Sequence, residues 1–368
     1  MTRCAGPVAL LLACLAATAS AQEPPAPAEE LALAELTRRA LQGLGPSIVE
    51  VEALGGLEEE FRAPTSEAEA KEQGGILAAG GFKQAYGPTT GLVVREDGLI
   101  LTTSFALSRE PRHLIVTLSD GRSLVARALG RDEARGLVLL KVDAKDLPVP
   151  PFAPAGAVQV GRWALAMGRG LGRTGSGLEL PVVSRGIVSG LGRVGGRAIQ
   201  TSAAVSPANY GGPLAGIDGK VMGLLVPLSL SGGMASVDIY DSGIGFAIPA
   251  DDLLRLVPRL ARGEHLQAGF LGVEPDRLSR DGVRVAQVVP GSPAAAAGLA
   301  PGDVVLKVDE VETRLAWQLR RALSARCAGD TVQLTVRRGT ATRTVEAKLA
   351  VQPAQAEPSD QPQEEEER

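Results

Sequence analysis

Side chains suited to acid–base, nucleophilic or metal chemistry are scarce in this 368-residue chain. It holds two histidines, His113 and His265, and three cysteines, Cys4, Cys14 and Cys327. Such residues can serve as bases, nucleophiles or metal ligands, but zinc sites, haem attachment and disulfide frameworks need several of them together. The supply excludes a histidine- or cysteine-rich metal site, and we expect no metal and no cofactor.

The composition limits the other classes of function. Lys and Arg number 38 against 42 Asp and Glu, a formal net charge of −4, so the chain offers no basic field for nucleic acid. Hydrophobic residues make up 45%, enough for ordinary cores, and the length is that of about two domains. The 45 glycines, with only 3% aromatic residues, fit many short strands joined by glycine turns.

The first 21 residues are similar to a secretory signal. Arg3 supplies the positive start, a short apolar run follows, and residues 19–21 (ASA) form a small-residue cleavage site before Gln22. The alternative is lipoprotein processing at Cys14. Either route predicts an exported protein, periplasmic or secreted. No later segment reaches about 18 apolar residues, so we expect no transmembrane span after signal removal.

Turn signals and hydrophobic spacing predict the elements that must position any site. Short strands separated by Asp-Gly turns between residues 91 and 250 indicate an antiparallel barrel or sandwich. Helical spacing is found at 31–43, 250–262 and about 315–326. The expected segments are a flexible stretch and helix (22–46), a strand-rich domain (47–262) with a long loop (55–86), a linker (263–267), a second unit (268–350) and a disordered acidic tail (351–368).

Four motifs, in this order, resemble the HtrA/Deg family of exported trypsin-like serine proteases, which carry a C-terminal PDZ domain. They are DGLILT at 97–102, GRD at 130–132 followed by LVLLKV at 137–142, QTSAAVSPANYGGPL at 200–214, and GIGFAIP at 243–249. The resemblance runs from about residue 36 to 349. It implies a mainly β fold: a trypsin-like double six-stranded β-barrel, followed by a PDZ domain, a small β-barrel with helices.

The resemblance also shows where the family's chemistry is missing. A catalytic triad needs a serine nucleophile, a histidine base and a carboxylate that orients the histidine. At these positions the chain has Tyr210, Phe105 and Gly136. Phe105 cannot take a proton, Gly136 has no side chain, and Tyr210 carries a phenol, a group whose reference pKa is about 10. The sequence predicts that the Phe105 and Tyr210 rings pack together where histidine and serine would meet.

The oxyanion hole is also predicted to be degenerate, because Ala208 replaces a family glycine. We expect left-handed backbone there, where a Cβ costs roughly 1–2 kcal/mol. Substitutes for the triad are not credible. Hydroxyls in turns mostly cap backbone groups, and strand-end histidines and lysines mostly face water. The candidates weighed are Ser202, Ser206, Ser104, Thr103, His113, His265 and Lys141.

The second unit keeps the pattern that carries PDZ function. GFLGV at 269–273 resembles the carboxylate-binding loop, whose exposed amides hold a peptide's terminal carboxylate while the peptide adds a strand. The helix beside it carries Arg320, whose orientation toward a peptide the sequence leaves open. The peptide-binding residues implied are Phe270, Leu271, Gly272, Val273, Leu319 and Leu323.

The sequence therefore favours an exported, non-catalytic HtrA-like protein that binds peptide C-termini or unfolded protein and acts as a scaffold, regulator or chaperone-like factor. One alternative is an active HtrA endopeptidase that uses non-standard residues in protein quality control. Another is a structural adaptor that binds through the barrel surface. The resemblance also implies a homotrimer.

Overall fold

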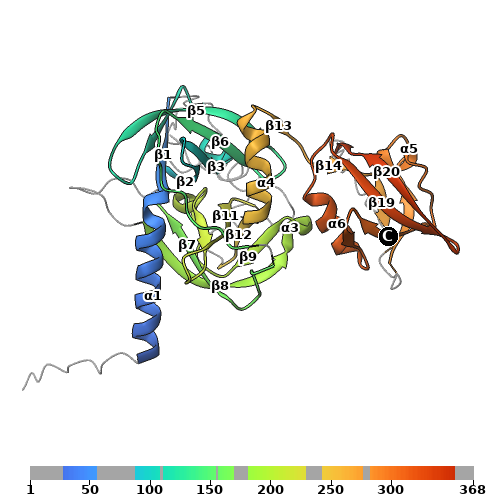
Figure 1. The fold of residues 1–368 in the computed structure, drawn as a ribbon, viewed down its shortest axis with the longest axis horizontal. Coiled ribbons are helices and arrows are strands. Elements are labelled where there is room, and N and C mark those ends of the chain that lie inside the picture. Colours follow the sequence, from blue (N-terminus) through green and yellow to red (C-terminus); the bar gives the residue numbers. More distant parts are fainter. Residues whose placement is uncertain are drawn as a thin grey trace, which may run out of the picture.

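The computed structural model describes residues 28–55, 88–107, 111–154, 156–169, 181–228, 243–276 and 282–352. The predicted signal (1–21), most of the long loop (55–86) and all but the start of the acidic tail (351–368) lie outside these residues. The chain forms two barrels side by side, with helix α1 (Ala28–Leu44) projecting from them and a smaller domain beyond (Figure 1). Within the described part, no helix is long and apolar enough to cross a membrane.

The first barrel is a closed ring of six strands in the order β5-β4-β1-β2-β3-β6, with β5 also paired to β6. Val49, Ile100 and Val138 fill it and are at most 1% exposed. Its strands are β1 (Ile48–Leu54), β2 (Thr89–Arg95), β3 (Leu99–Thr103), β4 (His113–Thr117), β5 (Ser123–Asp132) and β6 (Leu137–Val142).

The second barrel is a closed ring in the order β10-β11-β12-β9-β8-β7. Helix α4 (Ala250–Ala261) buries Leu253, Leu256 and Leu260 in the core shared by both barrels. Each fully buried leucine contributes about 1.5–3 kcal/mol relative to exposure. The strands are β7 (Trp163–Gly168), β8 (Val182–Gly192), β9 (Ala198–Thr201), β10 (Pro213–Ala215), β11 (Val221–Val226) and β12 (Gly245–Pro249).

Four short helices lie in the described part of the barrel domain. They are η1 (Gly45–Ser47), η2 (Ser104–Leu107), α3 (Arg193–Gly196) and η3 (Pro207–Asn209). The helices η2 and η3 matter most for function, since each carries or precedes a predicted triad position.

The C-terminal domain packs α6 (Ala316–Ser324) against a sheet in the order β15-β16-β17-β19-β20, with β18 on β17 and a separate β14–β21 pair. Its own core includes Val285, Val305 and Leu334. The remaining elements are β14 (Gly269–Phe270), β15 (Val273–Pro275), β16 (Val283–Val288), α5 (Pro293–Ala296), β17 (Val304–Val308), β18 (Val311–Glu312), β19 (Thr331–Arg338), β20 (Ala341–Lys348) and β21 (Ala350–Val351).

The structure adds two local elements to the expected ones. Hydrophobic spacing indicated only the helix at about 315–326 in the second unit, which also contains α5, capped by Ser292 and started by Pro293. Four residues are too short to show a helical period. The 263–267 segment, expected as a linker, contains strand β13 (His265–Leu266), which pairs in parallel with β5. This pairing holds the chain against the first barrel just before the C-terminal domain begins.

Candidate functional site

Phe105 and Tyr210 meet as an aromatic pair, called here the ring pair. Phe105 lies in η2, directly after β3, and Tyr210 follows η3. Their ring centroids are 5.4 Å apart with an interplanar angle of 77°, an edge-to-face contact. Both side chains are buried, at 4% and 7% exposed. The predicted packing of the two rings is confirmed, and such a contact contributes about 0.5–1.5 kcal/mol beyond burial.

Gly136 lies beside the helix that carries Phe105. Its carbonyl accepts a 2.8 Å hydrogen bond from the Ser104 amide, and a Cβ on Gly136 would come within 3.3 Å of Ser104 Oγ. Gly136 has a φ of +63°, in the left-handed region that disfavours side chains. A side chain at this position would therefore be strained in the present turn.

The turn before Tyr210 is closed by its own hydrogen bonds. The amides of Asn209 and Tyr210 donate to the carbonyls of Ser206 and Pro207, at 3.0 and 3.4 Å, respectively. The Ala208 carbonyl accepts a 2.7 Å hydrogen bond from Thr90 Oγ1. The amide at the nucleophile position is thus used within the turn and is not presented to a substrate oxyanion.

The expectation of left-handed backbone at Ala208 is wrong. Among the described non-glycine residues, positive φ occurs only at Asp146, Val194 and Asp309. Ala208 sits inside the η3 turn, so its Cβ adds no strain of the predicted kind. What opposes an oxyanion hole is the hydrogen bonding of the turn, which the residue type at 208 does not reveal.

The glycines after Tyr210 are required by packing. A Cβ on Gly211 would lie 2.0 Å from the Thr90 carbonyl, and one on Gly212 would lie 2.0 Å from the Met167 carbonyl. Gly211 also has a φ of +86°. The fold alone therefore accounts for this part of the nucleophile motif, whether or not a nucleophile is present.

Among the alternative groups, Thr103, Ser104 and Ser206 are close in the chain to the ring pair, whereas Lys141 lies further along β6. Lys141 lies four residues along β6 from Leu137, about 13 Å away, where it donates to the carbonyls of Asp97 and Val142. Ser202 Oγ accepts a 3.0 Å hydrogen bond from the Ile187 amide. Both histidines, His113 in β4 and His265 in β13, are exposed. Thr103 Oγ1 is buried and has no partner among the described residues.

Arg135 is the residue that sequence reasoning missed, and it directly precedes Gly136. Its guanidinium forms a 2.6 Å ion pair with Asp132, and both side chains are at most 1% exposed. Burial lowers the pKa of Arg135, but the nearby negative groups, Asp132 foremost, together outweigh this, and the net shift is upward. Arg135 also donates to the Ser324 carbonyl at the end of α6, 2.6 Å away. No local pattern distinguishes this arginine from a surface one.

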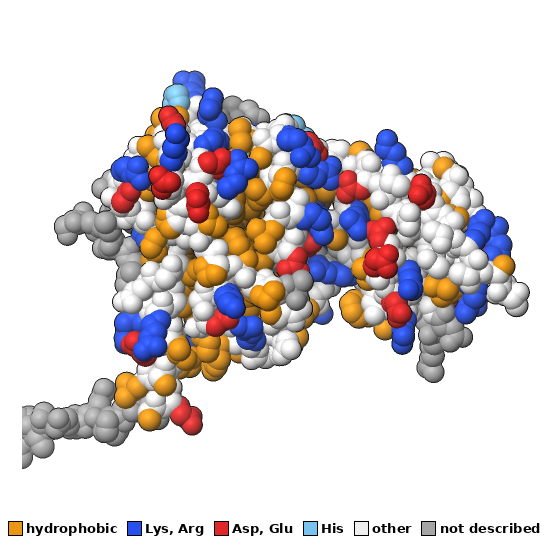
Figure 2. Space-filling model, viewed as in Figure 1, with side chains coloured by type: hydrophobic (Ala, Val, Ile, Leu, Met, Phe, Trp, Pro, Cys, Tyr) orange, Lys and Arg blue, Asp and Glu red, His pale blue; other side chains and the backbone are white. Residues whose placement is uncertain are grey.

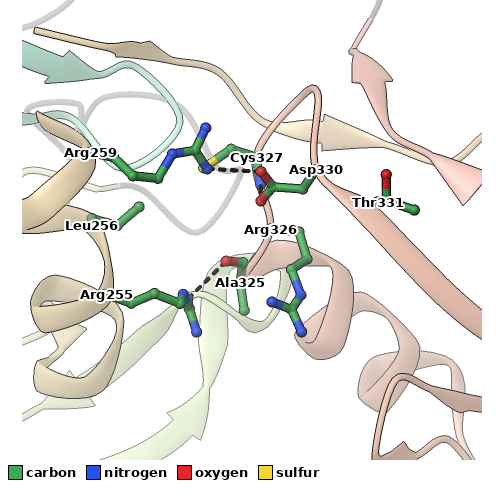
Figure 3. Close-up of a pocket in the computed structure, with 8 residues that line it drawn as sticks. All are labelled: Arg255, Leu256, Arg259, Ala325, Arg326, Cys327, Asp330 and Thr331. Carbon is green, nitrogen blue, oxygen red and sulfur yellow. Dashed lines mark hydrogen bonds and ion pairs between the residues drawn. The ribbon is translucent and has the colours of Figure 1, made fainter. Parts of the chain in front are cut away.

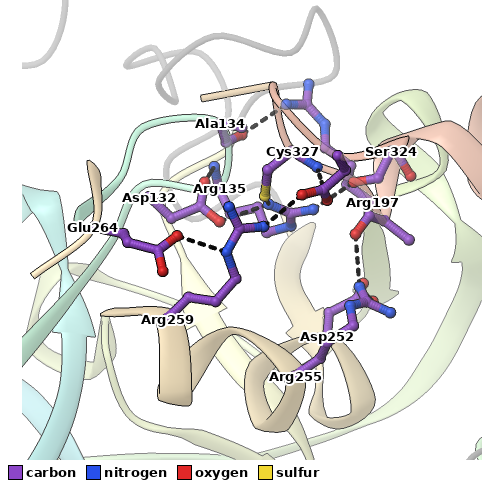
Figure 4. A network of polar contacts seen from close by, with 12 residues as sticks. Asp132, Ala134, Arg135, Arg197, Asp252, Arg255, Arg259, Glu264, Ser324 and Cys327 are labelled. Atoms are coloured by element: carbon purple, nitrogen blue, oxygen red, sulfur yellow. Dashed lines mark hydrogen bonds and ion pairs between the residues drawn. The ribbon is translucent and has the colours of Figure 1, made fainter. Parts of the chain in front are cut away.

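Arginines hold the two domains together along the same boundary (Figure 4). Arg321 donates to the Gly196 carbonyl and Arg255 to the Ala325 carbonyl, at 2.7 and 2.8 Å, and both hydrogen bonds cross the boundary. Arg197 donates to the Ala134 carbonyl within the barrel domain, at 2.6 Å. Cys327 lies inside this network, 3.8 Å from Arg135. Burial raises the pKa of the Cys327 thiol and Arg135 only partly opposes this, so the thiol stays protonated and is a poor nucleophile.

The loop at 270–273 has the form that a carboxylate site needs. Gly272 has a φ of +83°, and its Cβ would lie 2.2 Å from Ser292 Cβ. The Leu271 and Gly272 carbonyls accept hydrogen bonds from the amides of Ala294 and Val289, both at 2.9 Å. The Leu271 and Gly272 amides donate no hydrogen bond among the described residues, so they are available to a ligand.

The side chains predicted to bind peptide divide into two groups. Leu271 and Leu319 are 3% and 2% exposed and belong to the domain core, so they can support a pocket from below but offer little surface. Phe270, Val273 and Leu323 are half-buried. A ligand would reach these three side chains and the backbone amides of the loop.

Two closed six-stranded barrels followed by a domain with this loop define a trypsin-like peptidase fold joined to a PDZ domain. The trypsin-like peptidase domain family matches residues 89–224, and the PDZ domain family matches residues 269–349. The chain is 30% identical to the putative serine protease HhoA of Synechocystis sp., covering 70% of this chain and 69% of that relative. The chain belongs to the HtrA/Deg family.

Other relatives and solved structures with similar sequences are also named as proteases of this type. A probable periplasmic serine endoprotease DegP-like of Hahella chejuensis is 34% identical over 70% of this chain. The chain spans 56% of that relative's length. Among solved structures, the HtrA-type protease AlgW with tripeptide matches 86% of this chain and 98% of its own, with 25% identity and a TM-score of 0.61.

Proposed function

We propose that this chain is an exported HtrA-family protein that lacks serine-protease chemistry and acts by binding peptide C-termini or unfolded protein through its PDZ domain. The ring pair is the observation that carries the proposal. Two buried aromatic side chains in edge contact occupy the positions that the family resemblance assigns to base and nucleophile. Neither ring can activate water or a hydroxyl as a general base at neutral pH.

The surroundings of the ring pair also support a lack of serine-protease chemistry. The Tyr210 amide is hydrogen-bonded within its own turn, and Gly136 is left-handed with Ser104 against it. A substrate carbonyl would meet neither a nucleophile nor a preformed donor at Tyr210. Restoring activity would need changes in backbone as well as in side chains.

Peptide binding rests on the 270–273 loop. Its two available amides can hold a carboxylate, and the half-buried Phe270, Val273 and Leu323 can contact an apolar terminal side chain. Affinity is expected to be on the order of micromolar, about −8 kcal/mol. We also propose export to the periplasm or beyond and assembly into a trimer. Relatives named as periplasmic endoproteases support the first, and family membership supports the second.

Hydrolysis of casein by the purified full chain tests the enzymatic half, with an active serine endoprotease assayed in parallel. We expect a rate at the background of buffer alone. The competing function, an endopeptidase using unusual residues, is favoured by the names of the relatives. A rate that disappears in Ser206→Ala or Ser202→Ala would establish that function and overturn ours.

Titration of the full chain with free and amidated forms of apolar-ended peptides tests the binding half. We expect the free carboxylate form to bind and amidation to weaken it strongly, because amidation removes the charge that the loop amides hold. Equal affinity for both forms, or no binding to any peptide, would leave the PDZ domain with a structural role only.

A further inference from the structure

A pocket of about 300 Å³ lies at the boundary between the two domains, and neither the ring pair nor the 270–273 loop lines it (Figure 3). Helix α4 provides one wall and the segment from α6 to the start of β19 provides the other. The volume equals that of roughly ten water molecules at about 30 Å³ each, enough for one or two carboxylate side chains. Its lining residues are Arg255, Leu256, Arg259, Ala325, Arg326, Cys327, Asp330 and Thr331.

Three of the lining side chains are arginines whose hydrogen-bonding capacity is only partly used. Arg255 pairs with Asp252, Arg259 pairs with Glu264 and Asp330, and Arg326 pairs with Asp309. A guanidinium has five N–H donors, and these pairs leave several of them over. The clearest case is Arg326 Nε, which is buried without a partner in the described part of the chain. A buried donor without a partner needs an explanation, and an acceptor bound in the pocket would supply one.

The described part of the chain ends three residues after Leu349, which is hydrogen-bonded to a pocket residue, and an acidic segment follows in the sequence. The Leu349 amide donates to the carbonyl of Asp330, a pocket residue, at 2.8 Å, and the described chain ends at Gln352. The following 16 residues, 353–368, can span up to about 55 Å when extended. They contain no Phe, Trp, Tyr, Leu, Ile or Val, and six acidic residues against one basic: Glu357, Asp360, Glu364, Glu365, Glu366, Glu367 and Arg368.

We propose that the acidic segment 353–368 docks in cis on the arginine pocket, with its carboxylates bound by Arg255, Arg259 and Arg326. A segment without large apolar side chains has little to gain from burial on an apolar surface, whereas charge-assisted hydrogen bonds to guanidinium groups suit it well. Basic and acidic side chains are interspersed where the domains meet (Figure 2), so each docked carboxylate competes with an existing partner. The contact is therefore weak per residue, and in the full chain the tether adds an effective concentration in the millimolar range.

The test uses a chain that ends at Gln352, which keeps every described element, and a fluorescent peptide of residues 353–368 blocked at both ends. Blocking removes the free carboxylate, so the peptide cannot use the 270–273 loop in the way a C-terminus would. We expect saturable binding to the shortened chain that weakens at least several-fold from 0.1 to 1 M salt, as the Debye length falls from about 10 to about 3 Å. Replacing the six acidic residues by amides should abolish binding.

The site is located with variants of the shortened chain. Arg326→Gln and Arg255→Gln should each weaken peptide binding about tenfold, the loss expected for one charged hydrogen bond. Arg127→Gln, an exposed arginine on β5, is the matched control and should leave binding unchanged. Circular dichroism confirms that each variant is folded, and the two pocket variants serve as checks on each other.

The full chain decides whether docking occurs in cis. Its own tail should compete, so the labelled peptide should bind it several-fold more weakly than the shortened chain. The proposal is overturned if the shortened chain shows no saturable binding, if both pocket variants bind like the Arg127→Gln control, or if full and shortened chains bind the peptide equally well.

Discussion

The ring pair and the 270–273 loop are two sites of one chain. They differ in whether the groups that would act on a ligand are present. At the ring pair, the residues held in place by backbone contacts are present, such as Gly211 and Gly212, whereas the groups that would carry out chemistry are absent. At the loop, the same glycine that packing requires, Gly272, also shapes the two amides that a ligand would use.

This difference shows that a preserved motif is not by itself evidence for a preserved activity. Side-chain chemistry can be lost while the motif survives, because the motif's glycines serve the packing. A site made of backbone amides is lost only if its packing is lost. The barrel domain can thus be catalytically silent while the PDZ domain remains competent.

The largest expected effect is at the boundary that connects the two sites. Arg135→Ala leaves Asp132 buried and unpaired, which destabilises a fold by about 3–5 kcal/mol. Chemical denaturation of the full chain measures it. The double variant Arg135→Met with Asp132→Leu should recover most of the loss, because no unpaired charge remains. A loss below about 1 kcal/mol in Arg135→Ala would contradict this role.

A second variant tests whether the barrel domain lacks protease activity only because the catalytic side chains are missing. The triple reversion Phe105→His, Gly136→Asp and Tyr210→Ser should stay about 10²–10³-fold below an active endoprotease, the cost of one missing oxyanion donor. The closed turn at η3 and the left-handed Gly136 remain obstacles. Adding Ala208→Gly is informative: since Ala208 is not strained, we expect only a small further gain. Ordinary rates from the triple variant in a casein assay would contradict us.

The loop is tested by a matched pair of glycine variants in the PDZ domain. Gly272 and Gly291 both have positive φ, +83° and +72°, but a Cβ on Gly291 has nothing within 4 Å, whereas one on Gly272 meets Ser292. Gly272→Ala should weaken peptide binding about tenfold, and Gly291→Ala should not, although both carry a similar backbone cost. Calorimetric titration with a free-ended peptide measures this. Equal effects would mean that the loop geometry is not what binds.

The smallest effect is the coupling within the ring pair. A double-mutant cycle with Phe105→Leu and Tyr210→Leu should give a coupling energy of about 0.5–1.5 kcal/mol in unfolding experiments, as expected for an edge-to-face contact. The control is the cycle of Phe105→Leu with Phe152→Leu, because the ring contact described for Phe105 is with Tyr210. Its coupling energy should be near zero. Zero coupling for the ring pair would show that the two rings contribute only by burial.

The sequence was sufficient for the architecture and for much of the candidate site. The two barrels, the PDZ domain, helices α4 and α6 and the contact of Phe105 with Tyr210 could all be predicted, because they follow from local motifs in a fixed order. The closed turn at Ala208 could not, since neither its internal hydrogen bonds nor the one from Thr90, 118 residues away, can be recognised in the sequence. Arg135 could not either, since its partners Ser324 and Cys327 lie in the other domain.

The most direct test of the account is fluorophosphonate labelling of the full chain, followed by mass spectrometry, with and without a saturating PDZ peptide. The probe reports an activated hydroxyl nucleophile whether or not a good substrate is known. We predict no specific label on any residue in either condition, and the active endoprotease control labelled fully. A stoichiometric label on Ser206 or Ser202, or on Tyr210 once the peptide is bound, would contradict the claim that this chain has lost its catalytic chemistry.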